Sequence, residues 1–355
     1  MKKLLNKKAI SILMAVFLVV VCLAGCGQAE ETQESSALIT QSSQTEPTPS
    51  ETEDEEESSS TPGEEPTTDE TAPVVYMTTD ISSEGLMAIY EALGASPTGN
   101  VAVKLSTGEP GSNYLRTDLI GELVQSLEAT IVECNTAYGG SRANTAMHYQ
   151  VAEDHGYTAI TDVDIMDEEG SITLPVVGGD NLTENYVGSH FENYDYYVVL
   201  SHFKGHAMAG YGGAIKNISI GIASSEGKAH IHSGGTGGSM WSGEQDAFLE
   251  SMAEAGKSVV DALDGNILYI NVMNRLSVDC DCDGNPAQPD MHDIGILASF
   301  DPVAVDQACI DLVYAAEDGG SLVNRIESRN GLHTLEQAEK IGLGSRKYQL
   351  LSIDE

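Results

Sequence analysis

Short apolar runs alternate along residues 74–315 with longer stretches in which apolar side chains recur every three or four positions. Continuous short runs are typical of buried strands, and the wider spacing is typical of helices packed on a sheet. The pattern predicts an α/β fold with a mostly parallel sheet flanked by helices, in one body or two lobes. The predicted strands are Val74–Thr79, Val101–Leu105, Thr130–Cys134, Tyr196–Leu200, Ile267–Met273 and Ile294–Ser299.

Start and stop signals place helices between these strands. Ser82 or Ser83 is a candidate N-cap for a helix that contains Leu86 and Leu93, and Gly94 would end it. Asp301, followed by Pro302, is equally well explained as a helix cap. The other helices are predicted at Tyr114–Leu127, Ala143–His155, Glu244–Leu263 and Ala304–Ala315.

The amino terminus has the pattern of an export signal. Four lysines precede an apolar run, Ala9–Leu23, that is short for a membrane-spanning helix of about 20 residues. The run closes on Leu23-Ala24-Gly25-Cys26, where small residues precede a cysteine. We therefore expect residues 1–25 to be a lipoprotein signal peptide and Cys26 to be acylated, which would anchor the chain in the lipid bilayer on the extracytoplasmic face of the cell membrane.

Residues 26–73 differ sharply in composition from the rest. After Cys26 they contain 14 acidic residues, no Lys, no Arg and no aromatic side chain, and they are rich in Ser, Thr and Pro. Such a segment buries too little apolar surface to offset the entropy of ordering, so we expect a disordered tether. The predicted folded domain is 74–355.

Charge narrows the classes of partner. Residues 74–355 keep 41 acidic and 13 basic residues, a net charge near −28. Such a charge repels nucleic acid and anionic lipid, so no nucleic-acid partner is expected. It leaves room for a small molecule or a metal ion in a local pocket.

The first candidate site follows the strand Tyr196–Leu200. Four of the nine histidines and three lysines fall within 31 residues, interleaved with glycines that favour a loop and allow a close backbone approach. Histidines ligate metals or move protons, and a lysine beside a Gly-Gly pair could meet an anion or a carbonyl. The residues concerned are His202, Lys204, His206, Gly212, Gly213, Lys216, Asn217, His230 and His232.

The second candidate site follows the strand Ile267–Met273. Asp279 to Gly284 resembles the start of a calcium loop, but Pro286 and Asp290 depart from that pattern. Cys280 and Cys282 could instead join His292 around iron, nickel or zinc. Their spacing makes a disulfide between them strained, so two free thiols on an acidic turn are the remaining alternative.

These residues also carry a family resemblance. Several parts of the chain resemble the family described as domain of unknown function 362. They are Val75–Gly94, the Ser201–His206 and Gly212–Asn217 segments, the Cys280-Asp281-Cys282 triplet and the stretch Asp293–Ala304. Many members of that family carry an inserted ferredoxin-like domain. This chain has no C-x2-C-x2-C-x3-C run, so a conventional four-iron cluster is not expected.

A shorter stretch is similar to the nickel-pincer lactate racemases. That resemblance implies that His206 is a proton-transfer base, that Lys216 anchors the cofactor, and that His232 or His230 ligates the metal. It covers about thirty residues.

Three functions are compatible with these patterns. The first is an extracytoplasmic metal- or cofactor-binding protein with a redox role. The second is an enzyme that transfers a proton or hydride on a small hydroxy or oxo acid, with His206 and Lys216 as catalytic residues. The third is a solute-binding lipoprotein, which two lobes around a cleft would favour.

Replacing Cys26 by Ala tests the anchor. Alanine has no thiol to acylate, so we expect the variant to lose incorporation of labelled palmitate and to keep residues 1–25. Cys134→Ala is the matched control and should be labelled and cleaved like the wild type. Equal labelling of the Cys26→Ala chain would refute lipidation at this residue.

Overall fold

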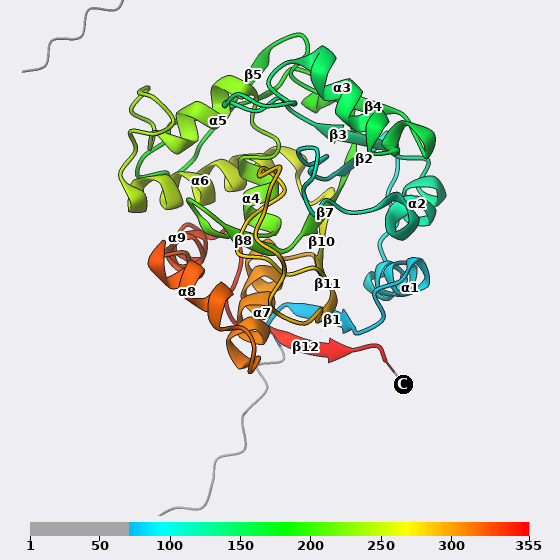
Figure 1. Ribbon diagram of the computed structural model, residues 1–355. Coiled ribbons are helices and arrows are strands. Elements are labelled where there is room, and N and C mark those ends of the chain that lie inside the picture. The colour runs from blue at the N-terminus through cyan, green and yellow to red at the C-terminus, as the bar shows by residue number, and fades with distance from the viewer. Residues whose placement is uncertain (1–70, 355) are drawn as a thin grey trace, which may run out of the picture. The chain divides into compact units, whose positions relative to one another are not determined.

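A computed structural model describes residues 71–354, which are built around one eight-stranded sheet (Figure 1). Seven of its strands run in the same direction, and β11 is antiparallel to both of its neighbours. The strands, in spatial order, are β12 (Gln349–Ser352), β1 (Val74–Thr78), β11 (Gly295–Ser299), β10 (Ile267–Met273), β7 (Tyr196–His202), β2 (Val101–Lys104), β3 (Thr130–Glu133) and β4 (Val163–Ile165).

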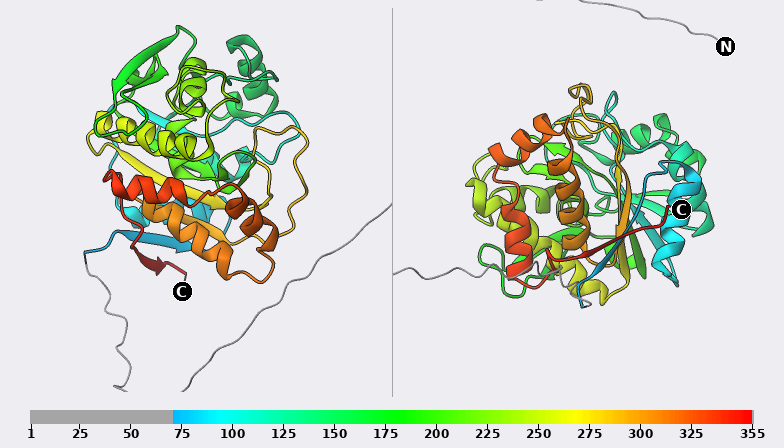
Figure 2. Two further views of the ribbon diagram at one scale, coloured as in Figure 1. Left: turned by 90° about the vertical axis from the view of Figure 1, so that its left-hand side faces the viewer. Right: turned by 90° about the horizontal axis from the view of Figure 1, so that it is seen from below.

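Helices cover both faces of the sheet, as the view from below shows (Figure 2). One face packs against α1 (Ser83–Leu93), α2 (Thr117–Ser126) and α3 (Thr145–Asp154). On the opposite side, α4 (Ala214–Ser219) and α7 (Pro302–Ala315) pack on the strands of this sheet. The remaining helices pack against these two, against one another or against the small sheets, and are α5 (Ser225–His232), α6 (Gln245–Leu263), α8 (Gly320–Ser328) and α9 (His333–Lys340). No helix in this part of the chain is long and apolar enough to cross a membrane.

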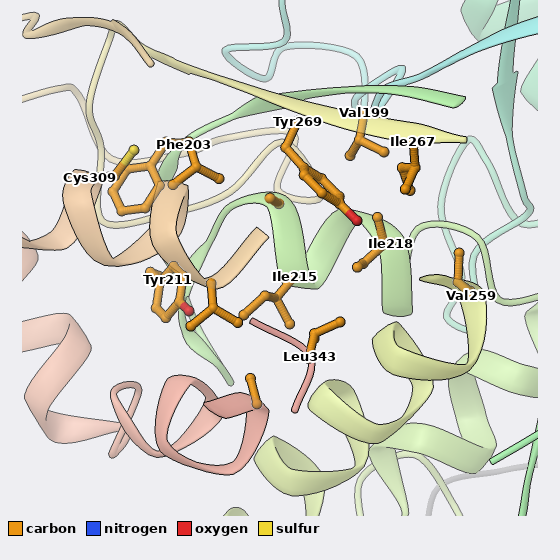
Figure 3. Close-up of a cluster of buried hydrophobic side chains, with 14 of the residues drawn as sticks. Val199, Phe203, Tyr211, Ile215, Ile218, Val259, Ile267, Tyr269, Cys309 and Leu343 are labelled. Atoms are coloured by element: carbon orange, nitrogen blue, oxygen red, sulfur yellow. The ribbon is translucent and has the colours of Figure 1, made fainter. Parts of the chain in front are cut away.

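Each face of the sheet has its own apolar core, because successive strand residues point to opposite sides. In β7, Val198 and Leu200 belong to the core under α1 and α2, whereas Tyr197 and Val199 belong to the core under α4 and α7. Figure 3 shows part of the second core, where Ile215 and Ile218 of α4 are packed among buried side chains such as Val199, Val259 and Tyr269.

The predicted fold class is confirmed, and several local signals act as expected. The Ser82 side chain accepts a hydrogen bond from the Gly85 amide, and Gly94 ends α1 with a left-handed backbone (φ 66°). Asp301 caps α7 by accepting bonds from the amides of Val303 and Ala304. Helix α2 begins at Thr117, three residues later than predicted.

The segment after β7 is more ordered than its glycines suggested. It forms a hairpin of β8 (Lys204–His206) and β9 (Gly210–Gly212), followed by α4 and α5. The sequence pattern also missed a second small sheet and two single-turn 3-10 helices. These are β5 (Ser171–Pro175) with β6 (Glu184–Gly188), η1 (Tyr157–Ala159) and η2 (Phe191–Asn193).

One buried carboxylate seats α4. Asp306 of α7 accepts hydrogen bonds from the amides of Ala214 (2.7 Å) and Ile215 (3.0 Å) and from the side chain of Asn271 (2.7 Å). A Cβ atom on Gly213 would lie 2.3 Å from this carboxylate, so only glycine fits there. Burial raises the pKa of Asp306 to about 6, and the three N–H donors act against that rise, so the group is charged at neutral pH.

The topology brings the carboxyl ends of β2, β3 and β7 together. These strands end at Lys104, Glu133 and His202 and are neighbours in the sheet. Ligands of open parallel sheets bind beyond such ends.

We expect Asp306→Asn to lower the free energy of unfolding by about 1–3 kcal/mol. The NH2 group of asparagine would replace a carboxylate oxygen that accepts a hydrogen bond, so two donors would face each other. Urea unfolding at pH 7 measures the change. Glu317→Gln, an exposed change just past α7, is the control and should stay within about 0.5 kcal/mol. Equal stability of the two variants would show that Asp306 does not hold α4.

Candidate functional site

A cavity of about 270 Å³ lies at this carboxyl edge of the sheet. Strand ends form its floor, and the β8–β9 hairpin, α4, α5 and the loop after β10 contribute to its walls. The charged and titratable side chains that line it are Lys104, Glu133, Tyr138, Arg142, His202, Lys204, His206, Lys216, Lys228, His232 and Asp281, together with Cys280 and Cys282.

The charge of the lining is opposite to that of the chain. Two of its side chains, Glu133 and Asp281, are acidic, whereas five are basic. The basic ones are Lys104, Arg142, Lys204, Lys216 and Lys228. The whole chain carries a formal net charge of −38. Basic side chains gathered against this background give the cavity a lining that suits an anion.

Lys216 is the basic side chain of the lining that lacks a partner within the part of the chain that the structure describes. Within residues 71–354, its ammonium group has no hydrogen bond or ion pair, and it faces the cavity from the first turn of α4. Burial by the surrounding protein, together with Lys204 and Lys104, lowers the pKa of Lys216 to about 7. A bound anion would restore the charge and satisfy the group.

Asn217, predicted to bind a cofactor, lines the cavity and ties the strand ends to α4. Its side-chain amide donates to the carbonyls of Lys104 and Leu200 and to the Ser201 hydroxyl, and its oxygen accepts from the Lys104 ammonium at 2.9 Å. Burial lowers the pKa of Lys104 to about 8. Asn217 therefore positions a neighbouring cation.

The ring of His206 is held with its proton toward the cavity. Its Nδ1 atom accepts hydrogen bonds from the backbone amides of Met208 (3.2 Å) and Ala209 (2.9 Å). Burial, with Lys216 and His232 nearby, holds the pKa of His206 well below its usual range, so the ring is neutral. A neutral ring that accepts at Nδ1 carries its proton on Nε2. His206 is thus a hydrogen-bond donor, and this geometry does not suit the base that the sequence resemblance implied.

His232 has the opposite tautomer. Its Nδ1 lies 2.7 Å from the Lys228 carbonyl, which can only accept, so the proton is on Nδ1. The ring stacks on Phe248, and burial lowers the pKa of His232 to about 4. Its Nε2 therefore has a lone pair that can accept a proton or bind a metal.

Asp281 joins the second candidate site to the first. Its carboxylate receives Lys204 Nζ at 2.5 Å and His202 Nδ1 at 3.1 Å, and His202 Nε2 bonds to the Asn274 carbonyl. Burial would raise the pKa of Asp281, but Lys204 and His202 hold it well below its usual range. Both nitrogens of His202 are occupied, which leaves none for a metal.

The acidic residues of the calcium-like loop do not converge. Asp281 faces Lys204, Asp279 pairs with Arg325, and Asp283 accepts from the Asn285 amide. These side chains therefore do not form the calcium loop that Asp279 to Gly284 resembles.

Cys280 and Cys282 form a disulfide with each other, contrary to the sequence expectation of free thiols or metal ligands. Their sulfurs and a ring nitrogen of His206 lie within 4.8 Å of one another, so these three residues could hold a metal ion. Such binding requires reduction to thiolates and release of the His206 Nε2 proton.

Two predicted metal ligands lie outside this group. The exposed His292 bonds to Asp318, with Nδ1 2.8 Å from the carboxylate. His230 packs beside the ring of Tyr186 and does not line the cavity.

Sequence reasoning missed several lining residues. Arg142 bonds to Glu133 and Glu109, and Glu133 also accepts from Thr107. Burial would raise the pKa of Glu133, but Arg142, His148 and Lys104 hold it well below its usual range. Lys104 and Glu133 could have been found from the sequence, because each is a charged residue at the end of an apolar strand. Trp241, the chain's single tryptophan, also lines the cavity and is 67% exposed.

A three-layer α/β body with a basic cavity at the strand ends is the class of protein that these observations define. The chain belongs to the family described as domain of unknown function 362, whose model matches residues 101–311. No curated protein matches it.

Solved structures to which this chain is similar include a lactate racemase apoprotein from Thermoanaerobacterium thermosaccharolyticum and a structural-genomics protein from Thermotoga maritima. The racemase is 13% identical with a TM-score of 0.42, over 68% of this chain and 57% of that chain. The second is 12% identical with a TM-score of 0.36, over 73% and 58%. This chain therefore spans less than two thirds of the length of either.

We expect Lys216→Met to stabilise the ligand-free protein near pH 6. The folded pKa of about 7 lies below the ordinary value of 10.5. The unfolded chain therefore binds more protons between these values, and wild-type stability rises with pH across that window. Methionine removes this penalty, which is worth about 1–3 kcal/mol at pH 6 and decreases steadily as the pH rises toward 10.5.

Urea unfolding from pH 6 to 10 measures this difference. Lys257→Met, which removes a lysine paired with Asp261 on α6, is the control and should show no such pH-dependent gain. A Lys216 variant no more stable than wild type at pH 6 would show that Lys216 is solvated or paired in solution.

Proposed function

We propose that the protein binds a small organic carboxylate in the basic cavity, either a free hydroxy or oxo acid or the carboxylate arm of a cofactor. The observation that carries this proposal is the Lys216 side chain, which lies among four other basic side chains and has no partner within residues 71–354. A cavity near 270 Å³ is at the small end of ligand sites, which suits a ligand of few heavy atoms.

The two neutral histidines favour a hydroxy or oxo acid among carboxylates. His206 offers an N–H donor for an oxo or carboxylate oxygen, and His232 offers a lone pair for a hydroxyl proton. Lys216 supplies the charge that pairs with the carboxylate. The three groups together match the acceptor, donor and charge of such an acid.

Turnover is a second candidate that the same geometry favours. An acceptor at His232 Nε2 could take a proton from the bound acid, while the His206 N–H stabilises negative charge on oxygen. The role of proton acceptor, which the sequence hypothesis gave to His206, then passes to His232. The solute-binding alternative loses its expected support, because the described residues form one compact unit around a single large sheet and not two lobes.

The pincer cofactor of the racemase resemblance fits the available donors. Lys216 has a free ammonium to anchor it, and His232 has a free Nε2 to ligate its metal. Such a group would supply a hydride-accepting centre when bound. Lys216 would then anchor it, and His206 would remain a donor toward the substrate oxygen.

Trp241 fluorescence can report binding, because this single tryptophan lines the cavity. We expect lactate and pyruvate to change the emission saturably, and Lys216→Met to weaken binding by about 10-fold or more through loss of a charge-assisted contact. Lys257→Met should bind like the wild type.

Native mass spectrometry of protein purified from its own host separates the two forms of the proposal. If the wild-type protein carries extra mass that the Lys216→Met protein lacks, the ligand is a cofactor with a carboxylate arm. If the wild-type protein has the unmodified mass and binds added lactate or pyruvate, the ligand is a free acid. Absence of both, or equal binding by the Lys216 variant, would refute the proposal.

A further inference from the structure

The Cys280–Cys282 disulfide is the reactive group in the cavity that the proposed function does not use. Both residues line the cavity, in the loop that follows β10. The other described cysteines, Cys134 and Cys309, are fully buried in the core and free. A disulfide facing a ligand cavity is accessible to a thiol that enters it.

The two sulfurs are not equivalent. Cys280 is 6% exposed, whereas Cys282 is partly accessible. The Cys282 amide donates a hydrogen bond to Cys280 Sγ at 3.3 Å. An incoming thiolate therefore reaches Cys282 more easily, and the sulfur that leaves, Cys280, already has a donor that would stabilise its negative charge.

The loop is held by contacts that do not depend on the disulfide. Asp281, between the two cysteines, is buried and bonded to Lys204 and His202. The Asp281 carbonyl accepts from the Glu109 amide at 2.7 Å. Opening the disulfide would therefore leave both sulfurs on the cavity wall, where the bond can form again.

We propose that this disulfide is redox-active and exchanges with a small carboxylate-bearing thiol. The thiolate attacks Cys282 Sγ, and the Cys280–Cys282 bond breaks with its electron pair passing to Cys280 Sγ. A second molecule of the thiol, as thiolate, attacks the mixed disulfide and releases the thiol's own disulfide. Cys280 and Cys282 take up two protons, so one protein disulfide is reduced and two thiols are oxidised.

The charge of the cavity selects the thiol. Cationic side chains outnumber acidic ones in the lining by five to two, which favours an anionic reductant over a neutral or cationic one. This selectivity depends on the cavity's charge and not on the organic acid proposed above. The export expected from the amino-terminal sequence would place the disulfide in a compartment where disulfides persist.

Alkylation of the full chain tests the disulfide itself. In native protein purified without reductant, we expect iodoacetamide to leave Cys280 and Cys282 unlabelled, as read by peptide mass spectrometry. Treatment with 3-mercaptopropionate should expose both to labelling. Cys134 and Cys309 serve as internal controls and should stay unlabelled, because they are fully buried.

Reduction rates test the selectivity. After correction for thiol pKa, we expect 3-mercaptopropionate to react about tenfold faster than 2-mercaptoethanol, and cysteamine to be slowest. Lys216→Met should shrink that ratio, and Lys257→Met should not. Rates that do not depend on the charge of the thiol would refute the choice of an anionic substrate.

Single variants test which sulfur is attacked. With the disulfide of 3-mercaptopropionate, Cys280→Ser should trap a mixed disulfide on Cys282, whereas Cys282→Ser should react much more slowly at the less exposed Cys280. The reverse order would overturn the assignment. Two further results would overturn the proposal. Labelling of both cysteines before reduction would show that they are free thiols. A stoichiometric metal ion that prevents labelling until it is removed by a chelator would show that the two cysteines bind a metal together with His206.

Discussion

The hydrogen bonds from the amides of Ala214 and Ile215 to Asp306 fix the position of α4. Two basic side chains of the cavity depend on that position, namely Lys216, which lies on α4, and Lys104, which bonds to Asn217 of the same helix. This helix has only six residues, which is too short to be stable alone. It persists because a carboxylate 92 residues away holds its first turn and because Ile215 and Ile218 are buried against the sheet. Lys216 and Asn217 follow directly, so the cavity's free cation and the anchor of Lys104 both depend on this contact.

The cavity is an arrangement that folding alone would not favour. A lysine held without an anion destabilises the native state, and two histidines kept neutral by burial give up favourable hydration. Such groups are typical of sites that interact with something else. The opposite tautomers of His206 and His232 add direction, because one ring can only donate into the cavity and the other can only accept.

The sequence was informative where local physics decides the structure. Long apolar strands and the caps at Ser82, Gly94 and Asp301 follow from short-range rules, and all appear where expected. The hairpin, α4 and α5 were missed because distant contacts stabilise them against the preference of their glycines.

The candidate site divides in the same way. Lys216 and His232 belong to one cluster in the sequence, but Lys104, Glu133 and Arg142 reach the cavity only because β2, β3 and β7 are neighbours in the sheet. Histidine tautomers cannot be inferred from sequence, since they depend on which backbone group each ring meets. Spacing alone predicted that a bond between Cys280 and Cys282 would be strained and favoured free thiols or metal ligands, whereas the structure contains the bond.

The separation of charge between surface and cavity has a kinetic consequence. Of the 13 basic residues in 74–355, five line the cavity, so the outer surface is left strongly acidic. An anion must cross a repulsive field before it reaches an attractive one. Dissolved salt screens the exposed field, with a Debye length of about 10 Å at 0.1 M, more than it screens charges enclosed by protein. Moderate ionic strength should therefore speed the capture of anions by this protein, whereas it slows capture by proteins whose basic sites lie on an open basic surface.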